Sequence, residues 1–319
     1  MLDRRQFAIR LTTGAMLART GAAFAQTGSR RQATMVVPYT PGGSTDVLGR
    51  LFAEAFSAQM GEKYILENRP GASGILGSSQ VAAAPGDGRT LLYCYGNLLL
   101  NQEFMMKDAP LKVLEVLTPV TRTCIIQAVI LAAPGFPANN LRELIALAKN
   151  NPGKYSYAYY GDLGIASMAA EADVSLLRVP YKGGVPGMVD VAAGTVDIIT
   201  SSLAQALPLM RSGKLKVLAV YGDERLAEWP NVTTIKEVLP NYRSLDYQVV
   251  LAPKSTPADV IAQMAQRADA ALANPEFKQS FLDRGAIVAP MQPKELRAFM
   301  ETDRALIEKI VKVAGITPT

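Results

Sequence analysis

Short apolar segments alternate with helix-like segments along most of this chain, and this alternation constrains its fold more than any other feature. In the first part, strands are expected at 34–38, 64–67 and 90–95, with helices at 46–60 and 75–84 between them. A second series of strands and helices follows from about residue 141 to residue 220. Strand–helix–strand order of this kind predicts an α/β protein with mainly parallel sheets covered by helices on both faces.

The chain is long enough for two such units. It has 319 residues, of which 49% are apolar, and both values suit two separate hydrophobic cores. Long β-rich segments near 120–132 and 244–252 lead from one unit to the other without a flexible spacer. We therefore expect two lobes with a cleft between them, lobe 1 formed by 33–125 and 250–319 and lobe 2 by 126–249.

The first 25 residues have the pattern of an export signal. A basic start, M-L-D-R-R-Q-F, is followed by a short apolar segment and by the A-x-A pattern of a cleavage site at Ala23 to Ala25. Arg4 and Arg5 followed by Phe7 are similar to a twin-arginine signal; a general secretory signal that begins with two arginines is the alternative. The expected location is the periplasm.

Charge and composition exclude several functions. The net charge is +5 for the whole chain but only +2 without residues 1–25, and no Lys/Arg run remains that would bind nucleic acid. No later segment is long and apolar enough to span a membrane. The sequence contains no histidine, which removes histidine bases, histidine-activated nucleophiles and histidine metal sites. We expect no enzyme, no catalytic residues, no cofactor and no metal.

Cys94 and Cys124 are the only cysteines, and each lies in an apolar segment. Two cysteines of an exported protein can pair, but their geometry cannot be inferred from spacing. We expect two buried free thiols, with a disulfide as the alternative.

The segment V-V-P-Y-T-P-G-G-S-T-D, from Val36 to Asp46, joins a predicted strand to a predicted helix. Ligands of open α/β sheets bind beside such loops. The backbone N–H groups of Gly42 to Thr45 would be unpaired at the start of the helix, where the helix dipole favours an anion. In the alternative interpretation, Ser44 or Asp46 caps the helix and the glycines only form the turn. The segment lacks the G-x-x-x-x-G-K-[ST] and G-x-G-x-x-G patterns, so a nucleotide is not expected.

A second strand-to-helix loop, Tyr160 to Ser167, offers a similar set of N–H groups. Weaker candidates follow other predicted strands. They are Tyr181 or Lys182 in the segment Pro180 to Gly184, Ser201 with Ser202, and the segment Tyr95 to Asn97.

Several segments in order resemble the Bug family of periplasmic solute-binding proteins of tripartite tricarboxylate transporters. The resemblance rests on V-V-P-Y-T-P-G-G-S-T-D, E-N-R-P-G-A-S-G, P-G-D-G-R-T-L-L, V-P-Y-K-G-G, A-G-T-V-D-I and L-P-L-M-R-S-G-K-L-K-V-L-A-V. It extends from about Thr34 to Ala314. It implies a two-lobed periplasmic binding fold of the second type that closes on a small carboxylate, held by the loops at Tyr39 to Asp46 and Gly161 to Ser167.

This resemblance, with the loop positions above, gives the expected ligand-binding residues. They are Tyr39, Thr40, Pro41, Gly42, Gly43, Ser44, Thr45, Asp46, Ser73, Gly96, Asn97, Tyr160, Gly161, Asp162, Leu163, Gly164, Ser167, Tyr181 and Ser201.

The chain departs from the family at three places. The segment between Gly164 and Val179 is shorter, Met168 replaces a common histidine, and Ser201 replaces a common aspartate that could bind a ligand ammonium group. The departure at Ser201 suggests a ligand without an α-amino group. An aliphatic dicarboxylate and an aromatic acid stacked on tyrosine both remain open.

The resemblance implies a monomeric capture protein that delivers a small-molecule carboxylate to membrane subunits of a tripartite tricarboxylate transporter. A ligand-dependent partner of a sensor with the same fold is the alternative, and an exported enzyme is a third, weaker one.

Overall fold

The computed structural model describes residues 32–319, apart from 108, 110, 182, 223, 243–245, 314 and 316–319. The expected export signal at 1–25 lies outside the described residues. Residues 33–319 form one compact unit, and the following description concerns that unit.

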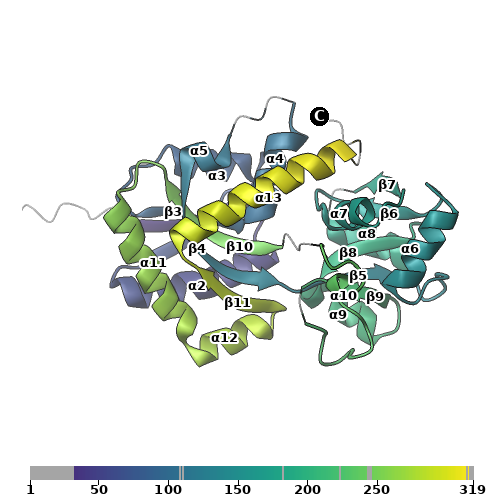
Figure 1. Ribbon diagram of the computed structural model, residues 1–319. Coiled ribbons are helices and arrows are strands. Elements are labelled where there is room, and N and C mark those ends of the chain that lie inside the picture. Colours follow the sequence, from purple (N-terminus) through teal and green to yellow (C-terminus); the bar gives the residue numbers. More distant parts are fainter. Residues whose placement is uncertain are drawn as a thin grey trace, which may run out of the picture. The chain divides into compact units, whose positions relative to one another are not determined.

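The first sheet has six strands in the order β11-β4-β10-β3-β1-β2 (Figure 1). Its strands are β1 (Ala33–Val37), β2 (Tyr64–Asn68), β3 (Thr90–Tyr95), β4 (Leu117–Ile126), β10 (Tyr247–Pro253) and β11 (Ala286–Met291). The second sheet has five strands in the order β7-β6-β8-β5-β9. Its strands are β5 (Ala128–Ala132), β6 (Ser156–Tyr159), β7 (Leu177–Pro180), β8 (Ile198–Ser202) and β9 (Lys216–Val220).

Both sheets are mixed, so the prediction of mainly parallel sheets is wrong. Strand β1 is parallel to β2 and β3, but β10 is antiparallel to β3 and β4, and β11 is antiparallel to β4. In the second sheet β6 is parallel to β7 and β8, whereas β5 is antiparallel to β8 and β9. The antiparallel pairs involve β4, β5 and β10, which lie where the chain passes from one sheet to the other. A strand that enters from the other sheet is not connected by a β-α-β unit and need not be parallel to its neighbours.

Helices cover both faces of the first sheet. One face packs against α2 (Ser44–Met60), α11 (Ala258–Ala273) and α12 (Pro275–Leu282). The other packs against α3 (Ile75–Ala82), α4 (Gly96–Met105) and α13 (Pro293–Val313). Alternate residues of β1 follow this division, because Met35 and Val37 contact the first group and Val36 the second. A 3₁₀ turn, Ala72–Gly74, and the short helix α5 (Val113–Val116) complete this part.

The second sheet is covered in the same way. Helices α6 (Leu141–Asn150), α7 (Gly164–Glu171) and α10 (Ile235–Val238) pack on the face that carries Ile130. Helices α8 (Gly184–Ala192) and α9 (Leu203–Arg211) pack on the face that carries Val129 and Leu131.

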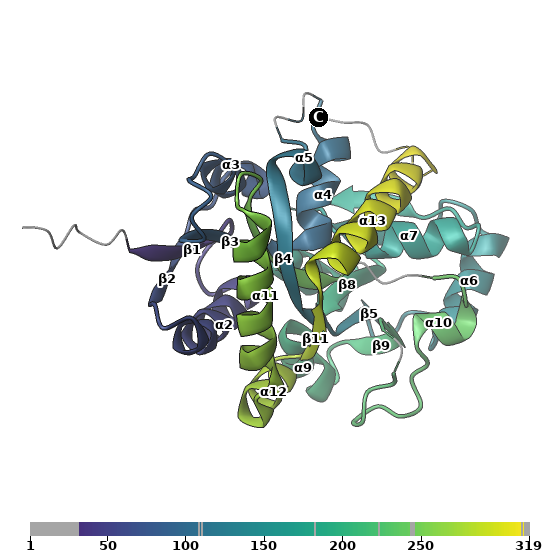
Figure 2. The same ribbon diagram turned by 60° about the vertical axis from the view of Figure 1, so that its left-hand side comes forward.

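Two features join the sheets. The apolar segment expected at 120–132 is divided at Gln127, with β4 in the first sheet and β5 in the second. The final helix α13 packs on α4 and β4 and also contacts α7, as Figures 1 and 2 show. Helix α12 and strand β11, between the two predicted C-terminal helices, were not predicted. No helix in the described residues is long and apolar enough to cross a membrane.

Cys94 and Cys124 are free and buried, which confirms the prediction of two thiols. Cys94 is paired in register with Val249 and Cys124 with Gln248, on opposite sides of β10. Two strand spacings of about 4.8 Å separate them, beyond the roughly 7 Å between Cα atoms that a disulfide tolerates. Burial raises the pKa of both thiols, that of Cys124 to about 12, so neither is a reactive thiolate.

Candidate functional site

A cavity of about 170 Å³ lies where the two predicted strand-to-helix loops meet. The first loop contributes Ser44, and the second contributes Tyr160 and Asp162. The remaining lining residues come from both sheets and their helices, and they are Tyr95, Leu98, Ile126, Ala128, Gly184, Thr200, Ser202, Gln205 and Asp246. The cavity is therefore the candidate functional site.

The first loop ends at the N-terminus of α2. Gly43 is the N-cap residue, and no side chain caps the helix from this position. Asp46, in the first turn, accepts a hydrogen bond from the Gly42 N–H (2.9 Å) and forms an ion pair with Arg50 (2.9 Å). The sequence prediction that the Gly42 amide is free is therefore wrong. Burial opposes the ionisation of Asp46, but the hydrogen bonds from Gly42, Arg50 and Asn68 outweigh it and hold its pKa below the ordinary value.

Three amides of this turn remain available. Within the described chain, the N–H groups of Gly43, Ser44 and Thr45 have no hydrogen-bond partner. Gly42 has a φ of +83°, a conformation that glycine adopts without strain, and it orients the turn. These amides carry the partial positive charge of the helix N-terminus, and an anion is favoured there.

Hydroxyl groups extend this surface. The Ser44 Oγ lies 2.9 Å from the Tyr95 Oη, and both residues line the cavity. The Gln248 Nε2 donates to the Thr45 Oγ1 at 3.4 Å from the adjacent strand β10. Burial raises the pKa of Tyr95, so its hydroxyl stays protonated and can donate to an acceptor.

The second loop also pairs an aspartate with a glycine amide, although here the aspartate precedes the helix. The Asp162 Oδ1 accepts from the Gly164 N–H (2.8 Å), as Asp46 does from Gly42. The Tyr160 hydroxyl donates to the Thr200 carbonyl (3.0 Å), which holds its ring at the cavity. The Asn101 Nδ2 donates to the Gly161 carbonyl (3.3 Å) and so links α4 to this loop. The predicted free amide of Gly164 is thus also occupied by an aspartate.

Two carboxyl groups face the same cavity, Asp162 from the second loop and Asp246 from the residue before β10. The Asp246 Oδ1 accepts from the Asn97 Nδ2 (3.1 Å). Burial raises the pKa of Asp162 to about 6. Burial and the Asp162 charge raise the pKa of Asp246 well above its ordinary value, against the hydrogen bond from Asn97.

Several predicted site residues lie away from the cavity wall. Thr40, Pro41, Gly42 and Ser73 are exposed, and Ser73 adopts a left-handed conformation (φ +53°). Tyr39 packs edge-on against Tyr95 and is half-buried behind it.

Others are used for packing. A Cβ atom on Gly96 would overlap the Tyr247 ring, Leu163 is buried in the first core, and the Tyr181 hydroxyl donates to Asp190 (2.6 Å). Ser167 is buried in α7 and its hydroxyl hydrogen bonds Tyr242. Ser201 is 1% exposed, and its hydroxyl donates to the Ser202 carbonyl.

Asp246, Thr200 and Gln205 also line the cavity, and the sequence did not predict them as site residues. Asp246 gave no signal, because it stands in no glycine loop and precedes a strand rather than following one. The strand predicted at 196–200 extends to Ser202, so Ser202 lines the cavity from the strand end. Among the described residues, no three His, Cys, Asp or Glu side chains gather as a metal site.

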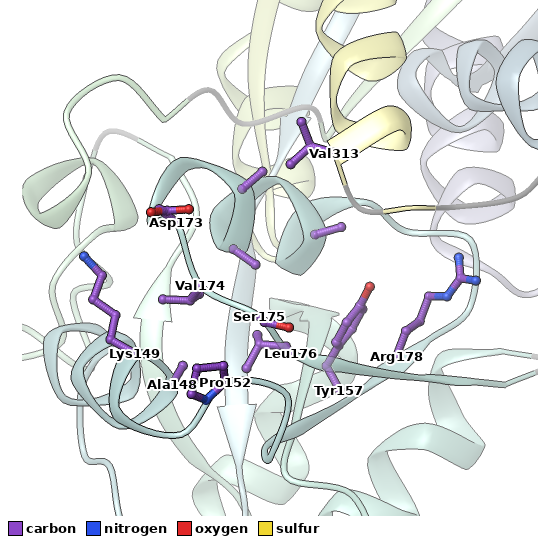
Figure 3. A pocket seen from close by; sticks show the side chains of 13 residues that line it. Ala148, Lys149, Pro152, Tyr157, Asp173, Val174, Ser175, Leu176, Arg178 and Val313 are labelled. Atoms are coloured by element: carbon purple, nitrogen blue, oxygen red, sulfur yellow. The ribbon is translucent and has the colours of Figure 1, made fainter.

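A larger hollow of about 580 Å³ lies beside α6 and α7, which cover the second sheet, and beside the end of α13 (Figure 3). Figure 3 shows Lys149 and Arg178 on opposite sides of it, with Val174 and Leu176 between them. None of the predicted ligand-binding residues lines this hollow. A third cavity, of about 610 Å³, lies on the other side of Asp246 against Arg122, Tyr242 and Phe299. Size alone would favour these two, but only the smaller cavity joins both loops.

Residues 48–316 match the family described as the tripartite tricarboxylate transporter family receptor. A UPF0065 protein of Bordetella pertussis is 31% identical over 317 residues, which cover 97% of each chain. Among solved structures, an R. palustris protein with adipate is 28% identical with a TM-score of 0.77 over 92% of this chain and 100% of that one. The periplasmic binding protein BugD is 29% identical with a TM-score of 0.72 over 90% of this chain and 99% of that one. The predicted two-lobed fold and Bug-type resemblance are thereby confirmed, and the chain belongs to the tripartite tricarboxylate transporter receptor family.

Proposed function

We propose that this protein captures a small organic carboxylate in the cavity between its two sheets and delivers it to the membrane subunits of a tripartite transporter. The observation that carries the proposal is the uncapped N-terminus of α2, whose Ser44 lines the cavity where both loops meet. Family membership supports it, and so does the adipate that accompanies the R. palustris structure.

The chemistry of binding follows from the donors at this end of the cavity. A carboxylate would accept from the amides of Gly43, Ser44 and Thr45, which have no partner within the described chain, and from the hydroxyl groups of Ser44 and Tyr95. A hydrogen bond to a charged group contributes about 1.5–3 kcal/mol, more than a neutral one. Ordered water between the amides and the carboxylate would let acids of different shape use one anchor.

We further propose that binding closes two lobes, 33–125 with 250–319 and 126–249, and that the protein acts as a periplasmic monomer. The chain passes from the first sheet to the second near Gln127, between β4 and β5, where a few residues could absorb the rotation. A ligand that touches Ser44 and Tyr160 at once would favour the closed form, because these residues belong to different lobes.

The proposal is tested by the thermal stability of the purified, ligand-free protein with paired acids and their amides. A ligand present at about 100 times its Kd adds roughly 2.7 kcal/mol to the free energy of unfolding, enough to raise Tm visibly. We expect at least one acid, aliphatic or aromatic, to raise Tm while its amide does not. If only compounds without a carboxylate raise Tm, the proposed function is wrong.

A further inference from the structure

The charge of the cavity does not match a ligand that is only an anion. Among the described residues that line it, Asp162 and Asp246 alone carry a formal charge, and both are acidic. A second carboxylate brought close to this pair would be repelled in a poorly solvated space. The two carboxyl groups therefore favour a ligand group that carries positive charge and N–H donors.

Each of these carboxyl groups has an oxygen left for a ligand. The Asp162 Oδ1 is held by the Gly164 N–H, and the Asp246 Oδ1 by the Asn97 Nδ2. In the described part of the chain, no hydrogen bond reaches Oδ2 of either residue. The two groups come from opposite sheets, so a ligand bound between them would also bridge the lobes.

Unpartnered acceptors next to the pair point the same way. Asn97 is 2% exposed, and its Oδ1 has no hydrogen-bond partner among the described residues, although its Nδ2 holds Asp246. The Ser202 Oγ, on the cavity wall, and the buried Gln248 Oε1 likewise find no partner in the described part of the chain. Buried acceptors without donors are costly, and of these three the Ser202 Oγ lies on the cavity wall, where a ligand N–H group could reach it.

We propose that Asp162 and Asp246 form a subsite for a cationic nitrogen of the ligand, so that the captured carboxylate also carries an ammonium group. This inference rests on the proposed function, since the carboxylate still binds at the start of α2. It replaces the expectation of a ligand without an amino group, which was based on Ser201. That residue is 1% exposed and is not part of the cavity wall, whereas Asp162 and Asp246 are.

The test uses thermal shift and calorimetry with matched compounds on one carbon skeleton. For chains of four to six carbons, the probes are the monocarboxylate, the dicarboxylate, the terminal amino acid and its N-acetyl derivative, together with the α-amino acids. The wild-type protein should bind an ammonium-bearing acid at least about tenfold more tightly than the bare acid or the N-acetyl derivative. Neither of these two compounds can form the charged hydrogen bond with the aspartates.

The variants Asp162→Asn and Asp246→Asn should each remove this preference while the bare acid still binds. Asp283→Asn, which makes the same change on the exposed end of α12, should leave it intact. Should Asp246→Asn fail to fold, Asp162→Asn and the wild-type comparison decide the question alone.

Two outcomes separate the proposals. If bare acids or dicarboxylates bind more tightly than every ammonium-bearing acid, the cationic subsite is refuted and carboxylate capture stands. If no acid binds, with or without an ammonium group, the proposed function fails and the subsite fails with it.

Discussion

At the scale of single residues, the two helix starts share one device. Asp46 and Asp162 each accept a hydrogen bond from one glycine amide beside a helix start, Gly42 before α2 and Gly164 at the start of α7. The sequence left two interpretations of the first loop, an anion cradle or a helix cap from Ser44 or Asp46. In the structure Asp46 accepts from the Gly42 amide, and the next three amides have no partner within the described chain. The distinction depends on side-chain rotamers, which the residue order does not determine.

Asp162 predicts a pH dependence of stability. Burial raises its pKa to about 6, above the ordinary value of 3.8. A group with a raised native pKa contributes stability that is present below its unfolded pKa and is lost as the pH rises through the native one. We therefore expect the wild type to lose stability relative to Asp162→Asn, which mimics the protonated group, between about pH 4 and pH 6, and the difference to level off above that range.

Urea unfolding at several pH values measures this difference. Two kinds of titratable or charged residue lie near Asp162 and Asp246. The first are tyrosines whose pKa values are raised by burial, and the second are charged residues that line the third cavity, which Asp246 also borders. They are Tyr95, Tyr157, Tyr159, Tyr160, Tyr221 and Tyr242, and Arg122, Glu224 and Lys236. The tyrosines stay neutral over this range. A stability difference between the wild type and Asp162→Asn that does not change with pH would refute the assignment.

At the scale of elements, the start of α2 is the proposed anchor, and Gly43 tests it. A Cβ atom at this position would meet only the Thr40 carbonyl, at 3.7 Å, and the backbone is extended (φ −73°, ψ 167°). Gly43→Val should therefore fold but crowd the free amides. We expect its affinity for the stabilising acid to fall at least about tenfold, the loss of one charged hydrogen bond.

The matched control is Gly135→Val, in an exposed turn where a Cβ atom meets nothing within 4 Å. Calorimetric titration of both variants with the same acid gives the comparison. Equal affinities in the two variants would argue against the anchor at α2.

Gly96, predicted as a ligand residue, begins α4 under an aromatic ring. A Cβ atom would lie 2.8 Å from the Tyr247 Cζ. Gly96→Ala should therefore lower the free energy of unfolding by about 1–3 kcal/mol through overpacking. Denaturant unfolding measures it, with Gly135→Ala as the control. Unchanged stability together with lost ligand affinity would instead support the prediction that Gly96 is a ligand-binding residue.

Local patterns predicted most elements but not their directions. The periodicity at 33–95 predicted β1, α2, β2, α3 and β3 to within two residues. It could not predict that β10 and β4 run antiparallel beside β3, because strand order depends on contacts between residues far apart in sequence. Strand β11 and helix α12 were also not predicted, and the sequence of β11 shows why in its case. A-I-V-A-P-M contains a proline, which lowers strand propensity, and β11 forms as the edge partner of β4.

At the scale of the whole molecule, two separately packed sheets share one small cavity, and the residues that line it come from both. The two loops that meet at the candidate site could be predicted because they carry glycine signals, but of the predicted ligand-binding residues only Ser44, Tyr160 and Asp162 line the cavity. Asp246 could not, since only the pairing of β10 with β3 and β4 brings it opposite Asp162.

The central claim is that a carboxylate binds at the start of α2. The most direct measurement is a crystal structure of the protein with the acid that raises Tm most. The acid should lie in the cavity between the sheets, with its carboxylate bound directly or through water to the amides of Ser44 and Thr45. Binding instead in the hollow between Lys149 and Arg178, with the α2 amides unoccupied, would contradict it.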